Sequence, residues 1–534
     1  MNMEFDEHES SRHLFQQPLY KVEGGSWQKY FDDSVREFNG RLTWDPAAIL
    51  SINSFGYVVG DRTLVKEIKR RPWLSQINKD GSIFLEEVPE HGRLWNSQDN
   101  IAARLEDLLC QEASEACAGY KKIYILLSGG LDSRIVAGVI HKLCKSGQIT
   151  SDVVCVTWGF EDCSDVVYGK FISELIGFKW QHVPINWGNL LENLGDFSIS
   201  TGAMVSPVHL HRMDWFRNIE KNSIVLGGSY GDSVGRAEYS GRHLLELDYP
   251  QPVNTLGLIN KSVLLEGVEA IERDLEKLYQ RCEDRLKYAL CECAFESNYM
   301  RNMLAHIMSV INSYSRVYQM FTHPDVYGYM WSLHPSLRDD GVYAKLLKRL
   351  DSKLASMPWS RTGRALEGKT AYTFNNRRKD FHSYKSWVSG PIYEKLRDYV
   401  SSSWFGETGL FDREKIEDLS RLVESKSKVY GFAPYERWIW LASFRKMAEH
   451  IKSMGKDVVF EKKISGEINI FLTQGKPLSF LRRYVNTGSV LCRLVMSFLE
   501  RLARLKKKYK RKRLKKDAIL KFPPVDISEK GMDV

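Results

Sequence analysis

The sequence predicts an α/β fold built on a doubly wound parallel sheet, followed by a largely helical half. Between residues 101 and 245, apolar runs of strand length alternate with segments of helical periodicity. Several of these runs end in turns rich in glycine, serine and aspartate, and residues from about 255 to 460 are mostly helical in pattern. Such an alternation is typical of βαβ units, whose ligands lie beyond the carboxyl ends of the strands.

The expected elements follow one another closely in this region. They are helix 101–117, strand 123–127, helix 133–146, strand 153–158, helix 164–177, strand 180–185 and strand 223–227. Residues 1–100 read as a small α+β segment, with strands expected at 41–44, 48–60 and 82–88. We therefore divide the chain into three predicted domains, 1–100, 101–460 and a basic appendage, 461–534.

Composition indicates an ordinary globular protein. The chain has 534 residues, of which 43% are hydrophobic, so it can bury a large core and form two or more domains. Its nine cysteines show no paired Cys-x-x-Cys spacing, which favours reduced thiols. The polar N-terminus does not resemble a signal peptide, and no uncharged apolar run reaches the roughly 20 residues that span a bilayer. We expect a cytoplasmic protein.

The positive charge is concentrated near the C-terminus. Residues 501–516 contain eleven Lys or Arg and no acid, so a net charge of +9 falls to −2 without them. The rest of the chain is near neutral, which argues against a nucleic-acid-binding face on the predicted domain 101–460.

The turn Ser128–Ser133, with the sequence SGGLDS, joins a predicted strand to a predicted helix. Its backbone N–H groups and the start of the helix favour an anion, and its glycines allow close approach. The hydroxyls of Ser128 and Ser133 can donate to phosphate oxygens, while Asp132 can hold Mg²⁺. The turn lacks the lysine of a Walker loop and the Gly-x-Gly-x-x-Gly of a dinucleotide site. An ordinary tight turn is the alternative.

Two further strand ends carry residues suited to a nucleotide. Trp158 follows the second strand, where it can pack on adenine or simply belong to the core. Asp232 follows the strand at 223–227, where it forms either a surface turn or a second ligand for the Mg²⁺ on Asp132.

The SGGLDS turn resembles the pyrophosphate loop of ATP pyrophosphatases. Together with Val156–Phe160 and Leu226–Asp232, it resembles the synthetase domain of asparagine synthetase-type amidotransferases. The resemblance implies that ATP is cleaved between its α and β phosphates, with Mg²⁺ on Asp132 and Asp232. The ATP-binding residues that it implies are Leu126, Ser128, Gly129, Gly130, Asp132, Ser133, Val156, Trp158, Gly227 and Gly228.

The resemblance continues through Thr322–Gly363 to the basic stretch Arg377–Phe381. There it implies a phosphate-contacting lysine, for which Lys379 is the first candidate and Lys385 the second. With Asp132 and Asp232, Lys379 completes the predicted catalytic residues. The alternative for Lys379 is a solvated surface charge.

Two departures from that family limit what carries over. No cysteine precedes Cys110, so residues 1–100 are interpreted as a shortened glutaminase-like remnant that does not hydrolyse glutamine. In the third strand-end loop, Ser229 and Ser233 stand where the family has glutamates. The acid that assists proton transfer is therefore missing, and its possible substitutes are Tyr230, Glu238 and Tyr239.

The resemblance implies amide synthesis on a carboxylate through an acyl-adenylate, with ammonia or an amine as the nitrogen donor. Aspartate, a peptide side chain and a glycan uronic acid all offer such a carboxylate, and we slightly favour the last. A catalytically weak or partner-dependent nucleotide-binding scaffold is one alternative. A nucleobase-modifying ATP pyrophosphatase is another.

The tail Ser489–Lys516 combines apolar residues at helical spacing with the basic run. It predicts either a helix packed on the body or an interfacial helix on an anionic membrane, which would place the protein peripherally at the membrane. RNA is a competing anion, but Tyr509 is the only aromatic residue between 501 and 516, so we do not expect nucleic acid as a partner.

Overall fold

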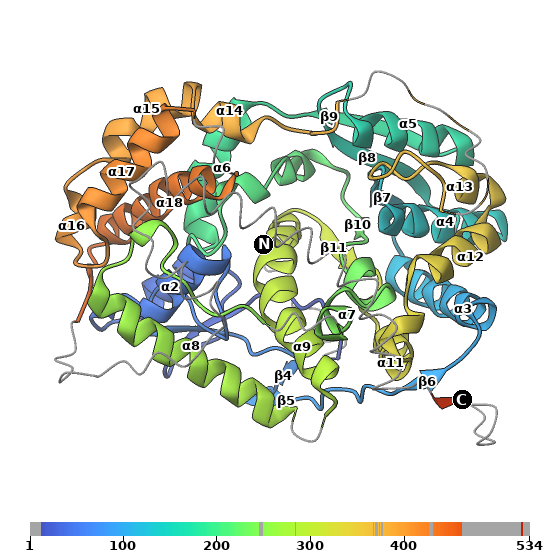
Figure 1. Ribbon diagram of the computed structural model, residues 1–534, viewed down its shortest axis with the longest axis horizontal. Helices are drawn as coiled ribbons and strands as arrows, with labels where there is room; N and C mark the ends of the chain where they lie inside the picture. The colour runs from blue at the N-terminus through green and yellow to red at the C-terminus, as the bar shows by residue number, and fades with distance from the viewer. Residues whose placement is uncertain are drawn as a thin grey trace.

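The computed structural model contains a parallel sheet of five strands, which lies in the right-hand part of Figure 1. The structure describes residues 12–461 and 525–526, except 245–248, 283–284, 367, 369–371, 373, 375–377 and 427–430. The spatial order is β11-β10-β7-β8-β9, and every pairing is parallel. The strands are β7 (Lys122–Leu126), β8 (Asp152–Gly159), β9 (Lys179–Pro184), β10 (Ser223–Gly227) and β11 (Arg316–Gln319).

The order of the strands creates a crevice at the edge of the sheet. From β7 the chain moves outward through β8 to β9 and then returns to add β10 on the other side of β7. The predicted doubly wound α/β fold is confirmed. The switch of direction falls between β7 and β10, where such sheets bind their ligands.

The helices predicted at 101–117, 133–146 and 164–177 are present as α3 (Gln98–Cys117), α4 (Leu131–Lys145) and α5 (Ser164–Ile176). A further helix, α6 (Trp187–Ser200), was not predicted and packs against α18 (Ala433–Ser453). Eleven of the fifteen residues of α4 are buried, because the helix packs against the sheet on one face and against α12 (Asp340–Leu350) on another. This burial fixes the start of α4, and with it the SGGLDS turn.

The strand predicted at 48–60 is wrong, because α2 (Pro46–Phe55) is a helix. The Asp45 side chain accepts hydrogen bonds from the N–H groups of Ala47 and Ala48, and Pro46 occupies the first helical position. Gly56 ends the helix with a left-handed φ of 89°. These signals at the two ends of the segment favour a helix, and they outweigh the strand preference of the β-branched residues inside it.

The fifth strand, β11, was expected to be helical. It follows a long run of helical pattern, η5 (Glu296–Ala305), α10 (His306–Ser309) and η6 (Val310–Ser313). The run ends where Asn312 accepts a hydrogen bond from the Val317 N–H at 2.7 Å, and β11 then pairs with β10. Because β11 is stabilised by pairing with a strand distant in sequence, the local periodicity of its residues does not predict it.

The N-terminal segment packs together with the C-terminal helices. Its remaining elements are β1 (Tyr20–Val22), α1 (Phe31–Glu37), β2 (Leu42–Thr43), β3 (Ile68–Arg70), β4 (Ser75–Ile77), β5 (Ile83–Leu85) and β6 (Leu94–Trp95). β2 pairs with β12 (Val458–Val459), and β6 pairs with β13 (Val525–Asp526). A second hydrophobic core joins residues 20–68 to residues 384–451.

The C-terminal half is largely helical, as predicted, and the other helices of the described residues lie between residues 207 and 453. They are η1 (Pro207–His209), η2 (Met213–Asn218), η3 (Gly231–Gly235), α7 (Glu238–Leu244), η4 (Thr255–Gly257), α8 (Lys261–Arg281), α9 (Lys287–Phe295), α11 (Pro324–Ser332), η7 (Pro335–Leu337), α13 (Ser352–Ser356), α14 (Tyr384–Val388), α15 (Pro391–Val400), α16 (Trp404–Glu407), α17 (Arg413–Glu424) and α18 (Ala433–Ser453).

Three predictions concern other parts of the chain. The eight cysteines within the described residues form no disulfide. None of the helices in the described part of the chain has the length and apolar character needed to cross a membrane. The interfacial helix predicted at Ser489–Lys516 lies outside the described residues.

Candidate nucleotide site

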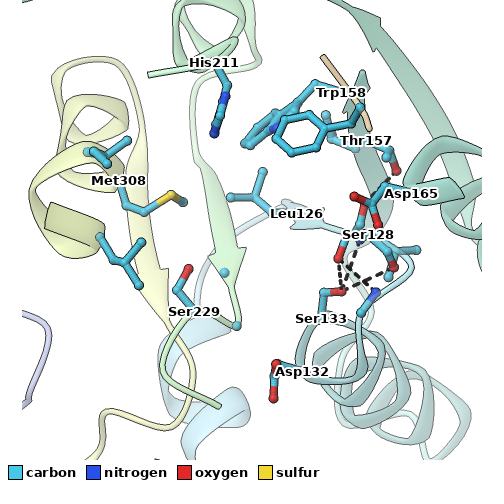
Figure 2. A pocket seen from close by; sticks show the side chains of 18 of the residues that line it. Leu126, Ser128, Asp132, Ser133, Thr157, Trp158, Asp165, His211, Ser229 and Met308 are labelled. Atoms are coloured by element: carbon cyan, nitrogen blue, oxygen red, sulfur yellow. Dashed lines mark hydrogen bonds between the residues drawn. The ribbon is translucent and has the colours of Figure 1, made fainter. Parts of the chain in front are cut away.

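The SGGLDS turn is held by its own hydroxyl groups. The Ser128 N–H donates to Ser133 Oγ at 3.1 Å, and the Gly130 N–H donates to Ser128 Oγ at 3.1 Å. Figure 2 shows these bonds at the edge of a pocket. The turn therefore has one defined shape, with the N-terminus of α4 directly behind it.

Gly129 has no room for a side chain. A Cβ atom there would lie 2.5 Å from the Ser360 Cβ and 2.7 Å from the Tyr168 Cδ2. Beneath it, the buried Arg134 guanidinium donates to the carbonyls of Met357 at 3.1 Å and Pro358 at 2.8 Å. The turn is thus tied to residues 354–360 by backbone packing that only glycine allows.

A cavity of about 360 Å³ lies beyond the carboxyl ends of β7, β8 and β10. Its volume is within the range of small-molecule sites. It is lined by Leu126, Leu127, Ser128, Gly130, Asp132, Ser133, Val156, Thr157, Trp158, Asp165, His209, His211, Met213, Gly227, Gly228, Ser229, Leu304, Ile307, Met308 and Phe381.

Most of the predicted ATP-binding residues line this cavity. Gly129 is absent from the lining because it packs against Ser360 and Tyr168. Asp232 and Lys379 are also absent from the lining. The predicted residues that do line the cavity are Leu126, Ser128, Gly130, Asp132, Ser133, Val156, Trp158, Gly227 and Gly228.

The Asp132 carboxylate lies beside the partly buried guanidinium of Arg236. Arg236 Nη2 is 3.5 Å from Asp132 Oδ2, and the same side chain pairs with Asp232 and, at 2.9 Å, with Asp340. The rings of Tyr343 and Trp359 lie 5.2 and 5.3 Å from the guanidinium. Burial raises the pKa of Asp132, while Arg236 opposes that rise. Arg236 therefore connects the two predicted metal ligands.

The donor set around Arg236 has the chemistry that Mg²⁺ prefers, since carboxylate oxygens are its usual protein ligands. Three carboxylates surround one guanidinium, which leaves a formal charge of −2 for a divalent ion to balance. No cluster of three or more His, Cys, Asp or Glu side chains within the described residues is arranged as a metal site. The residue types fit magnesium, but Arg236 already pairs with them.

Asp165 is a functional candidate that the sequence reasoning missed. Its Oδ1 accepts a hydrogen bond from the Gly129 N–H at 3.0 Å, and it lines the cavity (Figure 2). Burial raises the pKa of this carboxyl above its usual range. A signal was present, because Asp165 follows the end of β8 at the start of α5, facing the same crevice as Asp132.

Histidine and aromatic side chains form one end of the cavity. His211 lies 5.9 Å from Trp158 between ring centres, and its Nδ1 is 2.6 Å from the Tyr384 hydroxyl oxygen. Burial lowers the pKa of His211 to about 3, so the ring is neutral at pH 7. His209 Nε2 is 2.7 Å from Glu436 Oε1. His211 and Tyr384 therefore lie beside Trp158, the residue predicted to contact adenine, although no local sequence motif indicates either of them.

The third strand-end loop carries no acid into the cavity. Ser229 lines it, and its N–H donates to Gln319 Oε1 at 3.1 Å. The three proposed substitutes for the missing acid lie outside the lining. Tyr230 is buried, Glu238 is exposed, and Tyr239 stacks on Phe295 at 4.4 Å.

Lys379 is exposed, on a segment that borders the cavity. The Phe160 N–H donates to the Phe381 carbonyl at 3.1 Å, and Phe381 itself lines the cavity. Lys379 is thus two residues along the chain from Phe381, which lines the cavity. Lys385 Nζ lies 4.9 Å from the centre of the Tyr435 ring, outside the lining.

Comparison with known proteins gives little beyond the geometry. Neither a protein family nor a curated protein matches the chain. Among solved structures, NMN synthetase from Francisella tularensis matches with 15% sequence identity and a TM-score of 0.19. The match covers 41% of this chain and 94% of the NMN synthetase chain. A likeness at that TM-score carries no argument about function, and the fold class rests on the strand order described above.

Proposed function

We propose that this chain is an AMP-forming carbon–nitrogen ligase that activates a carboxylate with ATP. The observation that supports it is the convergence of three strand ends on one cavity, with the SGGLDS turn at its edge. The resemblance of that turn to the pyrophosphate loop of asparagine synthetase-type enzymes supports the same reaction. Aspartate, a peptide carboxylate and a uronic acid are all candidate substrates.

In the proposed reaction, a carboxylate oxygen attacks the α-phosphorus and the bond to the bridging α–β oxygen breaks. Pyrophosphate leaves and an acyl-adenylate remains. Ammonia or an amine then attacks the acyl carbon and loses a proton to solvent, while AMP leaves with the former carboxylate oxygen. The turn and the start of α4 orient the pyrophosphate, and Trp158 packs on the adenine.

Charge neutralisation is the second contribution of the site. Magnesium, when bound, would offset the phosphate charge, and Asp132 and Asp232 are the residues that would hold it. Arg236 pairs with both carboxylates and so holds them close together. We assign Lys379 to the phosphate charge at the mouth of the cavity, which requires its exposed side chain to reach inward.

Product analysis tests this function. Full-length protein incubated with ATP, Mg²⁺, ammonia and a panel of carboxylic acids should release AMP and pyrophosphate. ADP and inorganic phosphate would contradict the proposal. ATP binding without turnover would favour the scaffold, and turnover that requires RNA would favour a nucleobase-modifying enzyme.

Asp132→Asn and Asp232→Asn should each abolish most of that turnover and leave the thermal unfolding temperature near that of the wild type. Asp107→Asn, on an exposed face of α3, is the matched control. Unchanged turnover in Asp232→Asn would reject its role as a metal ligand.

A further inference from the structure

One wall of the cavity is apolar and lies opposite the SGGLDS turn. It is formed by Leu304 at the end of η5, Ile307 and Met308 in α10, and Met213 in η2. Figure 2 shows Met308 across the cavity from Ser128 and Ser133, with Ser229 on the same side as Met308. We call Met213, Leu304, Ile307 and Met308 the apolar wall.

The backbone that carries this wall is irregular. Residues 296–313 pass through a π-helical segment, an α-helical turn and a 3₁₀ segment in succession. A second π-helical segment, η3, follows the third strand-end loop directly. Turns of π-helix are rare and are found frequently at functional sites. Two of them beside one cavity suggest that its shape is adapted to a ligand.

The charges around the cavity exclude a second ionic contact on this wall. Among the described residues that line it there is no Lys or Arg. His211 is neutral because burial lowers its pKa to about 3, and His209 contacts Glu436. The remaining ionisable groups of the lining, Asp132 and Asp165, are acids near the turn. Away from the Ser229 hydroxyl, an additional carboxylate or a sugar hydroxyl would meet carbon and sulfur atoms there, at a desolvation cost.

We propose that the apolar wall binds the hydrocarbon part of a monocarboxylic acid, aliphatic or aryl, whose carboxylate points toward the SGGLDS turn. This inference rests on the proposed function, which places the nucleotide on the opposite side, between the turn and Trp158. Two of the four wall residues are methionines, whose flexible thioethers adapt to varied apolar shapes. The substrate class is therefore narrower than a carboxylate in general and differs from a uronic acid.

Substrate-dependent ATP–pyrophosphate exchange is the first test. With full-length protein, decanoic or 3-phenylpropionic acid should stimulate exchange at least about tenfold more than L-aspartate or D-glucuronic acid. Exchange with aspartate or glucuronic acid but not with the apolar acids would overturn the inference and leave the proposed function intact.

Calorimetric titration separates binding from catalysis. Decanoic acid should bind the full chain in the presence of α,β-methylene-ATP. Binding of decanoic acid without exchange for any acid would support the apolar wall and contradict the proposed function. Failure of both decanoic and 3-phenylpropionic acid to bind would overturn the inference.

Variants of Met308 locate the binding. Met308→Lys should weaken decanoic acid binding by about tenfold or more, because it places a charge in an apolar wall. The affinity for the ATP analogue should change by less than about twofold. Met303→Lys is the matched control, since Met303 lies in η5, is half-buried and is outside the lining.

Met308 is only 7% exposed, so the lysine variant could misfold. Met308→Ala then provides the second variant, which should weaken decanoic acid binding by about threefold, whereas Met308→Leu should retain it. Decanoic acid affinity unchanged in a folded Met308→Lys protein, or in Met308→Ala, would contradict the assignment.

Discussion

Two buried glutamates behind the third strand-end loop experience opposite electrostatic environments. Burial raises the pKa of Glu296 to about 8, and the nearby charge of Glu292 acts in the same direction. Burial alone would also raise the pKa of Glu292, but Arg338, at 2.7 Å, and His91 lower it below its usual range. Glu296 therefore favours its neutral form at pH 7, and Glu292 favours its charged form.

These environments predict opposite pH dependences for Glu296→Gln and Glu292→Gln. The raised pKa of Glu296 gives stability that is present below pH 4.5 and is lost as the pH rises through 8. Glu296→Gln should therefore gain stability relative to wild type between pH 5 and 8, by up to about 1.4 kcal/mol per pH unit. Urea unfolding measured across this range tests it, and parallel curves would contradict it.

Glu292→Gln is the counterpart. The lowered pKa of Glu292 gives stability that is present above its unfolded-state pKa and is lost as the pH falls through the folded-state value. This variant should cost about 3–5 kcal/mol at pH 7, because Arg338 would be left buried without its charge partner, and the cost should shrink in acid. A cost that is independent of pH would reject the ion pair as its cause.

Gly129→Ala tests the close packing of the SGGLDS turn. The added methyl group would meet Ser360 and Tyr168, so the turn must move. We expect the affinity for an ATP analogue, measured by calorimetry, to fall by about tenfold or more. Gly328→Ala, inside α11 with nothing within 4 Å, should instead add about 0.5–1 kcal/mol of stability and leave ATP affinity unchanged. Equal ATP affinity in both variants would contradict the role of Gly129.

At the scale of elements, the predictions succeeded where the signal was local. β7 and α4 follow directly from an apolar run, a glycine turn and helical periodicity, so the SGGLDS turn could be placed from the sequence. Asp165 also carried a local signal, because it follows the end of β8. Arg236 and the apolar wall could not be placed from the sequence, because tertiary packing brings Arg236 to Asp132 and the wall residues to the cavity. β11 was missed because β10, the strand with which it pairs, lies about 90 residues earlier.

Asp45 stabilises the start of α2, the helix found where the sequence predicted a strand at 48–60. It caps α2 and also accepts a hydrogen bond from Arg62 Nη1 at 2.9 Å. Asp45→Ala should therefore destabilise the protein by about 2–4 kcal/mol in urea unfolding. Asp45→Asn, which keeps the capping oxygen, should cost less. Asp33→Ala, at a half-buried position in the first turn of α1, should cost under about 0.5 kcal/mol. A similar loss in all three variants would contradict the capping role.

At the scale of the whole molecule, the N-terminal segment and the C-terminal helices share one hydrophobic core. Trp44 is 2% exposed and lies 4.6 Å from the Phe444 ring. The pairing of β2 with β12 joins the same two parts of the chain. We therefore expect residues 12–100 to unfold together with α18 rather than separately.

Trp44→Ala tests this coupling. It should lower the free energy of unfolding by about 3–5 kcal/mol and shift a single transition seen by both tryptophan fluorescence and far-ultraviolet circular dichroism. An early fluorescence transition that leaves the helical signal unchanged would show that the N-terminal segment unfolds independently.

The central claim of the proposed function is attack of a carboxylate oxygen on the α-phosphorus. Full-length protein can be incubated with ATP, ammonia and a carboxylic acid labelled with ¹⁸O in its carboxyl group. We predict that mass spectrometry of the products finds one ¹⁸O atom in AMP and unlabelled pyrophosphate. Label confined to the acid, with unlabelled AMP, would contradict an acyl-adenylate and with it the assignment of this chain as an AMP-forming ligase.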